Sequence, residues 1–287
     1  MAAACASTAT TTPIASGAPS APASTTSSTP AAIPTSTRTA VAVTVGGIAV
    51  SVSCEGEAAG RPTIVLMHGN GAGGQQQFRL VKPDLAKLSR VCEYSRPGTG
   101  RTPAPAHLPR PVTEVVTEAH EILDQAGIKS PVFLLGSSEG GVIAFMYAQA
   151  YPSEVAGFVS INPNPPYEQW IADVSKVETP DEVATLEEPD YRGENPERID
   201  NRPNSSMLTV PLPGSIPYAM MFDDDCGGDS AFCTKVFEPL RAITERLAKV
   251  GPGGRFVAVP GAGHNIEKSN PREVDRVVAE VWAEATP

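Results

Sequence analysis

The sequence predicts an α/β fold in which helices cover both faces of a mostly parallel sheet. Strand-like and helix-like segments alternate from about residue 38 to the end of the chain, an order typical of parallel sheets. The strand-like segments are continuously apolar, as expected of strands covered on both sides. With 287 residues, the chain is long enough to build a sizeable core around one such domain.

The predicted strands begin with a hairpin at one edge of the sheet. In "TAVAVTVGGIAVSVSC", residues 39–54, two short apolar runs flank Gly46-Gly47, a hairpin signal. This hairpin would add antiparallel edge strands. The later strands are short apolar runs bounded by Gly, Pro or polar residues. They are expected at 63–67, 90–95, 131–136, 155–162, 216–222 and 255–261.

Helices are expected between these strands. Residues 113–127 carry apolar side chains at helical spacing and end at Gly127. Pro152 ends another helical segment. The predicted helices cover 80–89, 113–127, 140–152, 232–251 and 270–285.

Two segments depart from this pattern. Residues 1–37 carry no charge and are almost entirely Ala, Ser, Thr, Pro and Gly, a composition typical of a disordered tether. Residues 163–213, after the sixth predicted strand, are proline-rich and acidic. We expect a cap insertion there over a binding site, or else a surface excursion without a ligand.

Charge and composition bear on partners and location. The formal net charge is −10 and no basic stripe is present, so we expect no nucleic-acid partner. No apolar run reaches the ~20 residues of a membrane span. Small residues before Cys5, followed by the tether, resemble the mature start of a bacterial lipoprotein, although the usual Leu and an export signal are missing. We therefore expect an exported protein, secreted or lipid-anchored at Cys5, over a cytoplasmic one; a plain unstructured tail is the alternative for Cys5.

The other cysteines favour an oxidising compartment. Cys226 and Cys233 flank a glycine-containing loop that a bridge could close, while Cys54 and Cys92 lie in strand-like runs. Two bridges and a leftover Cys5 fit an exported protein. Four buried free thiols in a cytosolic protein are the alternative.

The stretch "GSSEG", residues 136–140, is the strongest chemical signal. It matches G-x-S-x-G between a predicted strand and a predicted helix, the context of a nucleophile elbow. The spacing selects Ser138 as the nucleophile and places Ser137 at the variable position. The following helix would direct the partial positive charge of its N-terminus toward the site. A chance Gly/Ser turn is the alternative.

A second glycine-rich loop supplies an anion-binding site. "MHGNGAGG" follows the predicted strand 63–67 and can present the backbone N–H of Asn70. With the N–H of Glu139 it would form an oxyanion hole. His68 in this loop falls too early in the chain for the order Ser, acid, His, and is expected to orient the loop.

The better candidate for the general base is His264. It follows a predicted strand through the Gly-rich loop "PGAG", which leaves its imidazole free to approach Ser138. His107 and His120 are expected to face solvent. No His, Cys and Asp grouping has the spacing of metal ligands, so we expect neither a metal nor another cofactor.

The acid of the triad is expected among three consecutive aspartates. "MMFDDDCGG" places Asp223, Asp224 and Asp225 at the end of the strand after the cap. One of them should orient His264, and we favour Asp225, then Asp224. A Cys226–Cys233 bridge would hold this loop. Glu139 is expected to be a helix-start carboxylate.

Together these motifs resemble the α/β-hydrolase fold superfamily. "HGNG", "SRPGTGRT", "GSSEGG" and "PGAGHNIEKSNPREV" occur in the order of that family and cover most of residues 38–287. The resemblance implies Ser138 as nucleophile, His264 as base and Asn70 and Glu139 as oxyanion donors, with an acid from residues 223–225. The chain departs from the family at Ser95, where Asp is common, and at Asp223, where Gly is common.

The sequence thus predicts a serine hydrolase that cleaves a small-molecule carboxylic ester through an acyl-enzyme. One alternative is a proline-iminopeptidase-like exopeptidase, in which cap carboxylates such as Glu187, Glu188 and Glu194 would hold an ammonium group. Glu139 stands where that subgroup usually has Trp. Another alternative is a non-catalytic binding protein with the same fold. The sequence leaves the oligomeric state and the acyl and alcohol groups of the substrate open.

Overall fold

The computed structural model describes residues 38–71, 74–186, 197–225 and 233–286. The predicted tether of residues 1–37, with Cys5, lies outside these ranges, as does Cys226. The described ranges hold every strand that the sequence predicts and most of the predicted insertion.

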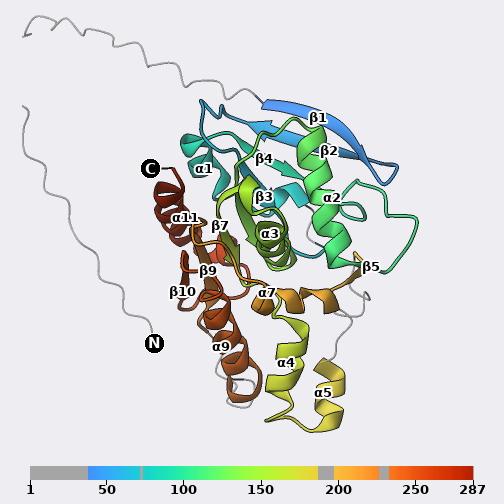
Figure 1. Ribbon diagram of the computed structural model, residues 1–287, viewed down its shortest axis with the longest axis vertical. Coiled ribbons are helices and arrows are strands. Elements are labelled where there is room, and N and C mark those ends of the chain that lie inside the picture. The colour runs from blue at the N-terminus through green and yellow to red at the C-terminus, as the bar shows by residue number, and fades with distance from the viewer. Residues whose placement is uncertain (1–37, 72–73, 187–196, 226–232, 287) are drawn as a thin grey trace, which may run out of the picture. The chain divides into compact units, whose positions relative to one another are not determined.

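An eight-stranded sheet forms the centre of the fold (Figure 1). The hairpin and strand β4 pair antiparallel at one end, and the strands from β4 to β10 pair parallel. In spatial order the strands are β1 (Arg38–Val45), β2 (Ile48–Glu55), β4 (Val91–Tyr94), β3 (Ile64–Met67), β6 (Val132–Ser137), β7 (Val155–Ile161), β9 (Tyr218–Asp223) and β10 (Gly254–Val259). The predicted antiparallel edge hairpin is confirmed, with Gly46 and Gly47 at φ +55° and +78°, as a tight two-residue turn requires.

Helices cover both faces of this sheet (Figure 1). Helices α1 and α11 pack on one face, with Leu85, Val278 and Trp282 in one apolar cluster. Helices α2, α3 and α9 belong to the cluster on the other face. The principal helices are α1 (Lys82–Leu88), α2 (Val112–Gln125), α3 (Glu139–Ala150), α9 (Glu238–Leu247) and α11 (Pro271–Ala285).

The predicted insertion of residues 163–213 lies between β7 and β9. It contains α4 (Tyr167–Val174), α5 (Pro180–Leu186), β8 (Ile199–Asp200) and α7 (Ser206–Thr209). Strand β8 pairs with β5 (Arg110–Pro111), a two-residue strand too short to be predicted from periodicity. The strand before the insertion is the sixth strand of the prediction. It carries the label β7 because β5 adds one to the numbering. In Figure 1, α4 and α5 extend away from the sheet.

One predicted helix is shorter than expected. The segment 232–251 forms a π-helical turn at Cys233–Phe237 and then α9, which has Pro239 in its first turn. Proline fits the first turn because the N–H that it lacks would have no acceptor there. The short helix α10 (Ile266–Ser269) was not predicted.

A disulfide joins the hairpin to the parallel part of the sheet. Cys54 and Cys92 face each other on neighbouring strands β2 and β4, with their Cα atoms 4.1 Å apart. Cys233 is also disulfide-bonded; Cys226, its predicted partner, lies outside the described residues.

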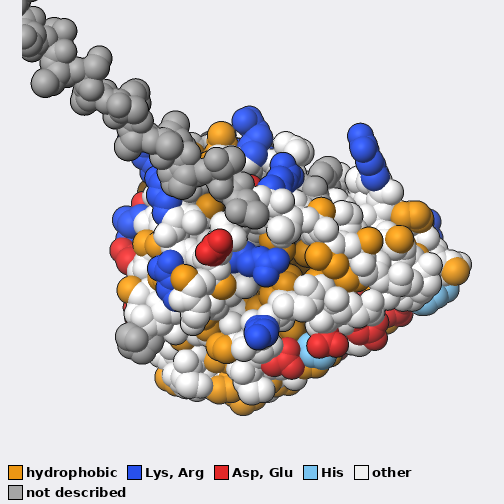
Figure 2. All heavy atoms as spheres, turned by 90° about the horizontal axis from the view of Figure 1, so that it is seen from above, with side chains coloured by type: hydrophobic (Ala, Val, Ile, Leu, Met, Phe, Trp, Pro, Cys, Tyr) orange, Lys and Arg blue, Asp and Glu red, His pale blue; other side chains and the backbone are white. Residues whose placement is uncertain are grey.

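The surface is mixed in charge on the face shown in Figure 2. Lys and Arg side chains lie scattered among acidic, apolar and uncharged ones, without forming one stripe. In the described part of the chain, no helix combines the length and the apolar character that crossing a membrane requires.

Candidate active site

Ser138 occupies a strained turn between β6 and α3. Its backbone has φ +53° and ψ −120°, a conformation that is costly for a residue with a side chain. Its N–H donates to the carbonyl of Ile161 at 2.7 Å. A Cβ on Gly136 would lie 2.1 Å from the carbonyl oxygen of Gly140, and one on Gly140 would lie 1.9 Å from that of Met67. The two flanking glycines therefore let the turn form, as the predicted elbow requires.

The loop after β3 passes directly beside this turn. A Cβ on Gly69 would lie 3.2 Å from the Cβ of Ser138. The predicted oxyanion donor Asn70 follows Gly69 in this loop. The other, the N–H of Glu139, belongs to the first turn of α3, where N–H groups point out along the helix axis. The elbow and the loop therefore meet around Ser138, an arrangement suited to binding an anion.

His68 orients this loop and is unsuited to act as a base. Its Nδ1–H donates to the carbonyl of Gly69 at 2.7 Å, and its Nε2 accepts the N–H of Arg96 at 3.3 Å. Burial and the nearby Arg96 guanidinium lower the pKa of His68 to about 3. The ring therefore stays neutral around pH 7 with both nitrogens hydrogen-bonded.

A buried ion pair that the sequence did not predict fixes the same loop. Arg96 donates to the carbonyl oxygens of His68 and Gly69 at 2.6 and 3.1 Å, and pairs with Glu197 at 2.6 Å. Burial favours the neutral acid, but the Arg96 guanidinium holds the pKa of Glu197 below its usual range. Because Glu197 belongs to the insertion, the pair ties the insertion to the loop of His68, Gly69 and Asn70, the candidate oxyanion loop. The stretch "SRPGTG" contains Arg96, but no sequence signal identified its partner.

Glu139 also contacts the insertion. Its buried carboxylate accepts amide hydrogens from Asn164 at 3.3 Å and Asn201 at 2.8 Å, one from each half of the insertion. The side chain of Glu139 thus anchors the insertion beside the elbow, while its backbone N–H belongs to the candidate oxyanion hole.

The loop that carries His264 reaches the same edge of the sheet. His264 lies after β10, and its carbonyl accepts the side-chain N–H of Asn162 at 2.9 Å. Asn162 follows Ile161, whose carbonyl binds the Ser138 N–H, so the serine and histidine loops are both tied to the end of β7. The imidazole itself is exposed. Within the described residues, no hydrogen bond joins it to the Ser138 hydroxyl.

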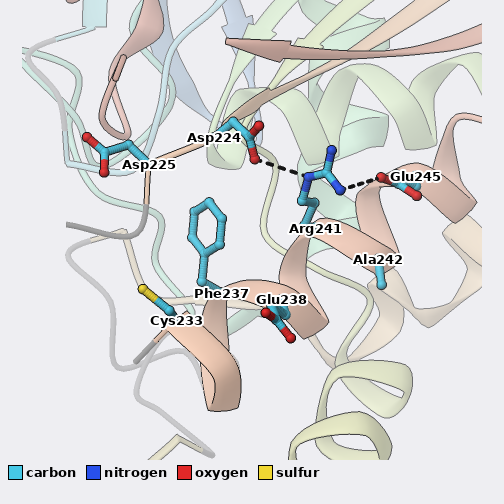
Figure 3. Close-up of a pocket in the computed structure, with 8 residues that line it drawn as sticks. All are labelled: Asp224, Asp225, Cys233, Phe237, Glu238, Arg241, Ala242 and Glu245. Atoms are coloured by element: carbon cyan, nitrogen blue, oxygen red, sulfur yellow. Dashed lines mark hydrogen bonds and ion pairs between the residues drawn. The ribbon is translucent and has the colours of Figure 1, made fainter. Parts of the chain in front are cut away.

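The three candidate acids have different surroundings. Asp223 accepts the N–H of Gly263, next to His264, at 3.0 Å, and its own N–H donates to the Asn162 side chain at 2.8 Å. Burial raises the pKa of Asp223, and the hydrogen bond from the Gly263 N–H is the largest effect that opposes this shift. Asp224 instead accepts from Arg241 at 3.1 Å (Figure 3).

The predicted order of the acids, Asp225 and then Asp224, can be compared with these surroundings. Asp225 is exposed and, in Figure 3, points away from Arg241. Asp223 accepts a hydrogen bond from the histidine loop, whereas Asp224, the second choice from sequence, accepts one from Arg241. The sequence could not separate three adjacent carboxylates, because their contacts come from distant segments.

Two pockets are lined in part by this acidic loop. One, about 230 Å³ in volume, is lined by Asp223, Asp225 and His264 together with Asn162, Phe222 and Leu240. The other, about 580 Å³, is lined by Asp224, Asp225, Phe237, Arg241 and Glu245 (Figure 3). The first adjoins the candidate base. Glu187, Glu188 and Glu194, on which the exopeptidase alternative depends, lie outside the described residues.

Comparisons with known proteins identify the fold. A family profile described as the alpha/beta hydrolase fold matches residues 62–185. A putative lipase from Acinetobacter baumannii superposes with a TM-score of 0.62 at 18% identity, covering 86% of this chain and 92% of that one. The chain has the α/β-hydrolase fold.

The relatives found by sequence either match only part of this chain or match most of it at lower identity. An abhydrolase domain-containing protein of Caenorhabditis elegans, abhd-5.2, is 31% identical over 120 residues, which is 40% of this chain and 27% of that protein. A putative 2-succinyl-6-hydroxy-2,4-cyclohexadiene-1-carboxylate synthase of Bacillus subtilis is 26% identical over 271 residues, 82% of this chain and 94% of that protein. The first three curated relatives are matched over 27%, 36% and 40% of their length.

Proposed function

We propose that this protein is a serine hydrolase that cleaves a small carboxylic ester. The observation that carries the proposal is the backbone of Ser138, held at φ +53° between two glycines that no larger residue could replace. Such strain persists only where the surrounding structure enforces it, and it is typical of functional residues. The similarity to a putative lipase adds support.

In the proposed reaction Ser138 attacks the ester carbonyl and His264 accepts its proton. The backbone N–H groups of Asn70 and Glu139 bind the oxyanion of the tetrahedral intermediate. His264 then protonates the departing alcohol, which leaves an acyl group on Ser138. Water, deprotonated by His264, releases the acid and restores the serine. We propose Asp223 as the acid that orients His264, because it binds the backbone beside that histidine.

The ring of His264 must turn toward Ser138 for this reaction. Catalytic hydrogen bonds are often long or absent in the free enzyme and form only with substrate bound. The exposure of the imidazole leaves room for such a rotation.

The test is hydrolysis of p-nitrophenyl acetate and butyrate by the wild type and by Ser138→Ala. Loss of the nucleophile should lower kcat by at least about 10³-fold. Ser269→Ala, an exposed serine on α10, is the matched control and should keep wild-type turnover. Equal turnover by Ser138→Ala and the wild type would refute the mechanism, and a wild type inactive on every ester and amide tried would favour a binding protein.

A further inference from the structure

A closed ring of buried hydrogen bonds lies behind the elbow. The side-chain nitrogen of Gln77 donates to the hydroxyl of Ser137 at 3.0 Å and to the carboxyl of Glu267 at 2.9 Å. The Ser137 hydroxyl donates to the other oxygen of Glu267 at 3.2 Å. Ser137 and Glu267 are 0% exposed and Gln77 is 5% exposed. The three groups therefore satisfy one another away from solvent.

This ring extends to the oxyanion loop through one more bond. The side-chain oxygen of Gln77 accepts the backbone N–H of Gly69 at 2.6 Å. With its nitrogen bound to Ser137 and Glu267, the Gln77 amide is fixed in one orientation. The position of the peptide before Asn70 thus depends on that orientation.

The ring and its extension lie close in sequence to the groups of the proposed mechanism. Ser137 precedes the nucleophile, Gly69 precedes Asn70, and Glu267 follows His264 by three residues. The ring joins three segments that are far apart in the chain, with Gln77 and Glu267 separated by 190 positions. It is therefore placed to hold the elbow, the oxyanion loop and the segment after the base in register.

Stability alone is a poor reason for this arrangement. In the described part of the chain Glu267 forms no ion pair, and its two hydrogen-bonding partners are neutral side chains. Burying a carboxyl group in this way is costly, and well-packed apolar side chains are often at least as stabilising. Apolar side chains at all three positions of the ring would avoid this cost. The cost of burying Glu267 indicates that the ring serves to position neighbouring groups.

We propose that Gln77 and Glu267 are positioning residues for the oxyanion hole. Glu267 and Ser137 fix the Gln77 amide, and Gln77 fixes the Gly69 peptide so that the next N–H, that of Asn70, is directed toward the oxyanion. The oxyanion part of this inference rests on the proposed function. The inference also gives Ser137 a role distinct from that of its neighbour Ser138.

The kinetic arm of the test compares Gln77→Ala with Gln76→Ala, its exposed neighbour in "GGQQQF". Gln77→Ala should lower kcat on p-nitrophenyl acetate about 10- to 100-fold, with KM changed less than about threefold, because a misplaced donor weakens binding of the transition state more than of the ester. Gln76→Ala should match the wild type. Glu267→Ala should resemble Gln77→Ala, and Glu267→Gln, which can still bind both partners, should restore most of the rate.

The second arm of the test does not depend on catalytic activity. In the inactive Ser138→Ala background, NMR should show the Gly69 amide proton exchanging with solvent at least about tenfold faster when Gln77→Ala is added, and unchanged when Gln76→Ala is added. Unchanged exchange would overturn the inference even if the protein were not an esterase. Unchanged kcat in Gln77→Ala, with Ser138→Ala inactive, would overturn it while leaving the proposed function intact.

Discussion

Three chemically identical side chains follow one another at the end of β9, and their surroundings differ. Asp223 binds the backbone beside His264, Asp224 binds Arg241, and Asp225 is exposed. A triad acid must fix the tautomer and orientation of its histidine, so a carboxylate tied to the histidine loop is better placed than one paired with an arginine.

Replacing each aspartate by Asn should therefore give unequal effects. Asp223→Asn should lower kcat on p-nitrophenyl acetate by about 10²- to 10⁴-fold, because the amide cannot stabilise an imidazolium. Asp224→Asn and Asp225→Asn should stay within about threefold of the wild type and serve as internal controls. A collapse of activity in Asp225→Asn, with Asp223→Asn active, would show that the order favoured by the sequence is the right one.

The sequence predicts some of these residues and not others for a physical reason. Ser138 and its two glycines form a local pattern, since a sharp turn needs those residues at those spacings. Gln77, Asn162 and Glu267 carry no local signal, because each is held in place by bonds to residues 60 to 190 positions away. Such contacts emerge only once the strands are assembled.

At the level of elements, the packing of α1 against α11 brings the carboxyl groups of Asp84 and Asp275 close together. Burial and the nearby negative charge of Asp84 raise the pKa of Asp275 to about 6. A hydrogen bond from Lys87 keeps the pKa of Asp84 below its usual range. The protonated form of Asp275 is therefore favoured in the folded protein. Protonated Asp275 stabilises the folded protein fully below about pH 4, the pKa of this carboxyl group in the unfolded chain. This stabilisation is lost as the pH rises through about 6.

Asp275→Asn should remove this dependence on pH. The variant should match the wild type in free energy of unfolding at pH 4 and exceed it by about 1 kcal/mol at pH 7.5, after allowance for solvent screening. Urea unfolding followed by circular dichroism at both pH values measures the difference. Glu280→Gln, an exposed position on the same helix, is the control. A variant less stable than the wild type at pH 7.5 would contradict the assignment.

Prediction at this level was better for long elements than for short ones. The strands of the central sheet and the helices α2, α3 and α11 could be predicted, because long apolar periodicities report burial directly. The two-residue strands β5 and β8 and the four-residue α10 could not, since each is held by tertiary contacts. Yet α10 carries Glu267, and β8 fastens the insertion to β5.

For the whole molecule, the central feature is convergence at one edge of the sheet. The elbow after β6, the oxyanion loop after β3 and the loops after β9 and β10 are linked by the Gln77 ring, Asn162 and the Arg96–Glu197 pair. In a parallel sheet the carboxyl ends of the strands share one edge, so residues far apart in sequence meet there. The fold explains how Ser138 and His264 can serve one site.

The claim that Ser138 and His264 serve one site is tested most directly by identifying the residue that reacts with a fluorophosphonate. Incubation of the native protein with the probe, followed by digestion and mass spectrometry, should show one adduct, on Ser138 and not on Ser137. Labelling should be absent in Ser138→Ala and at least about 10²-fold slower in His264→Ala. A native protein that folds normally and acquires no adduct, or acquires it on another residue, would contradict the account.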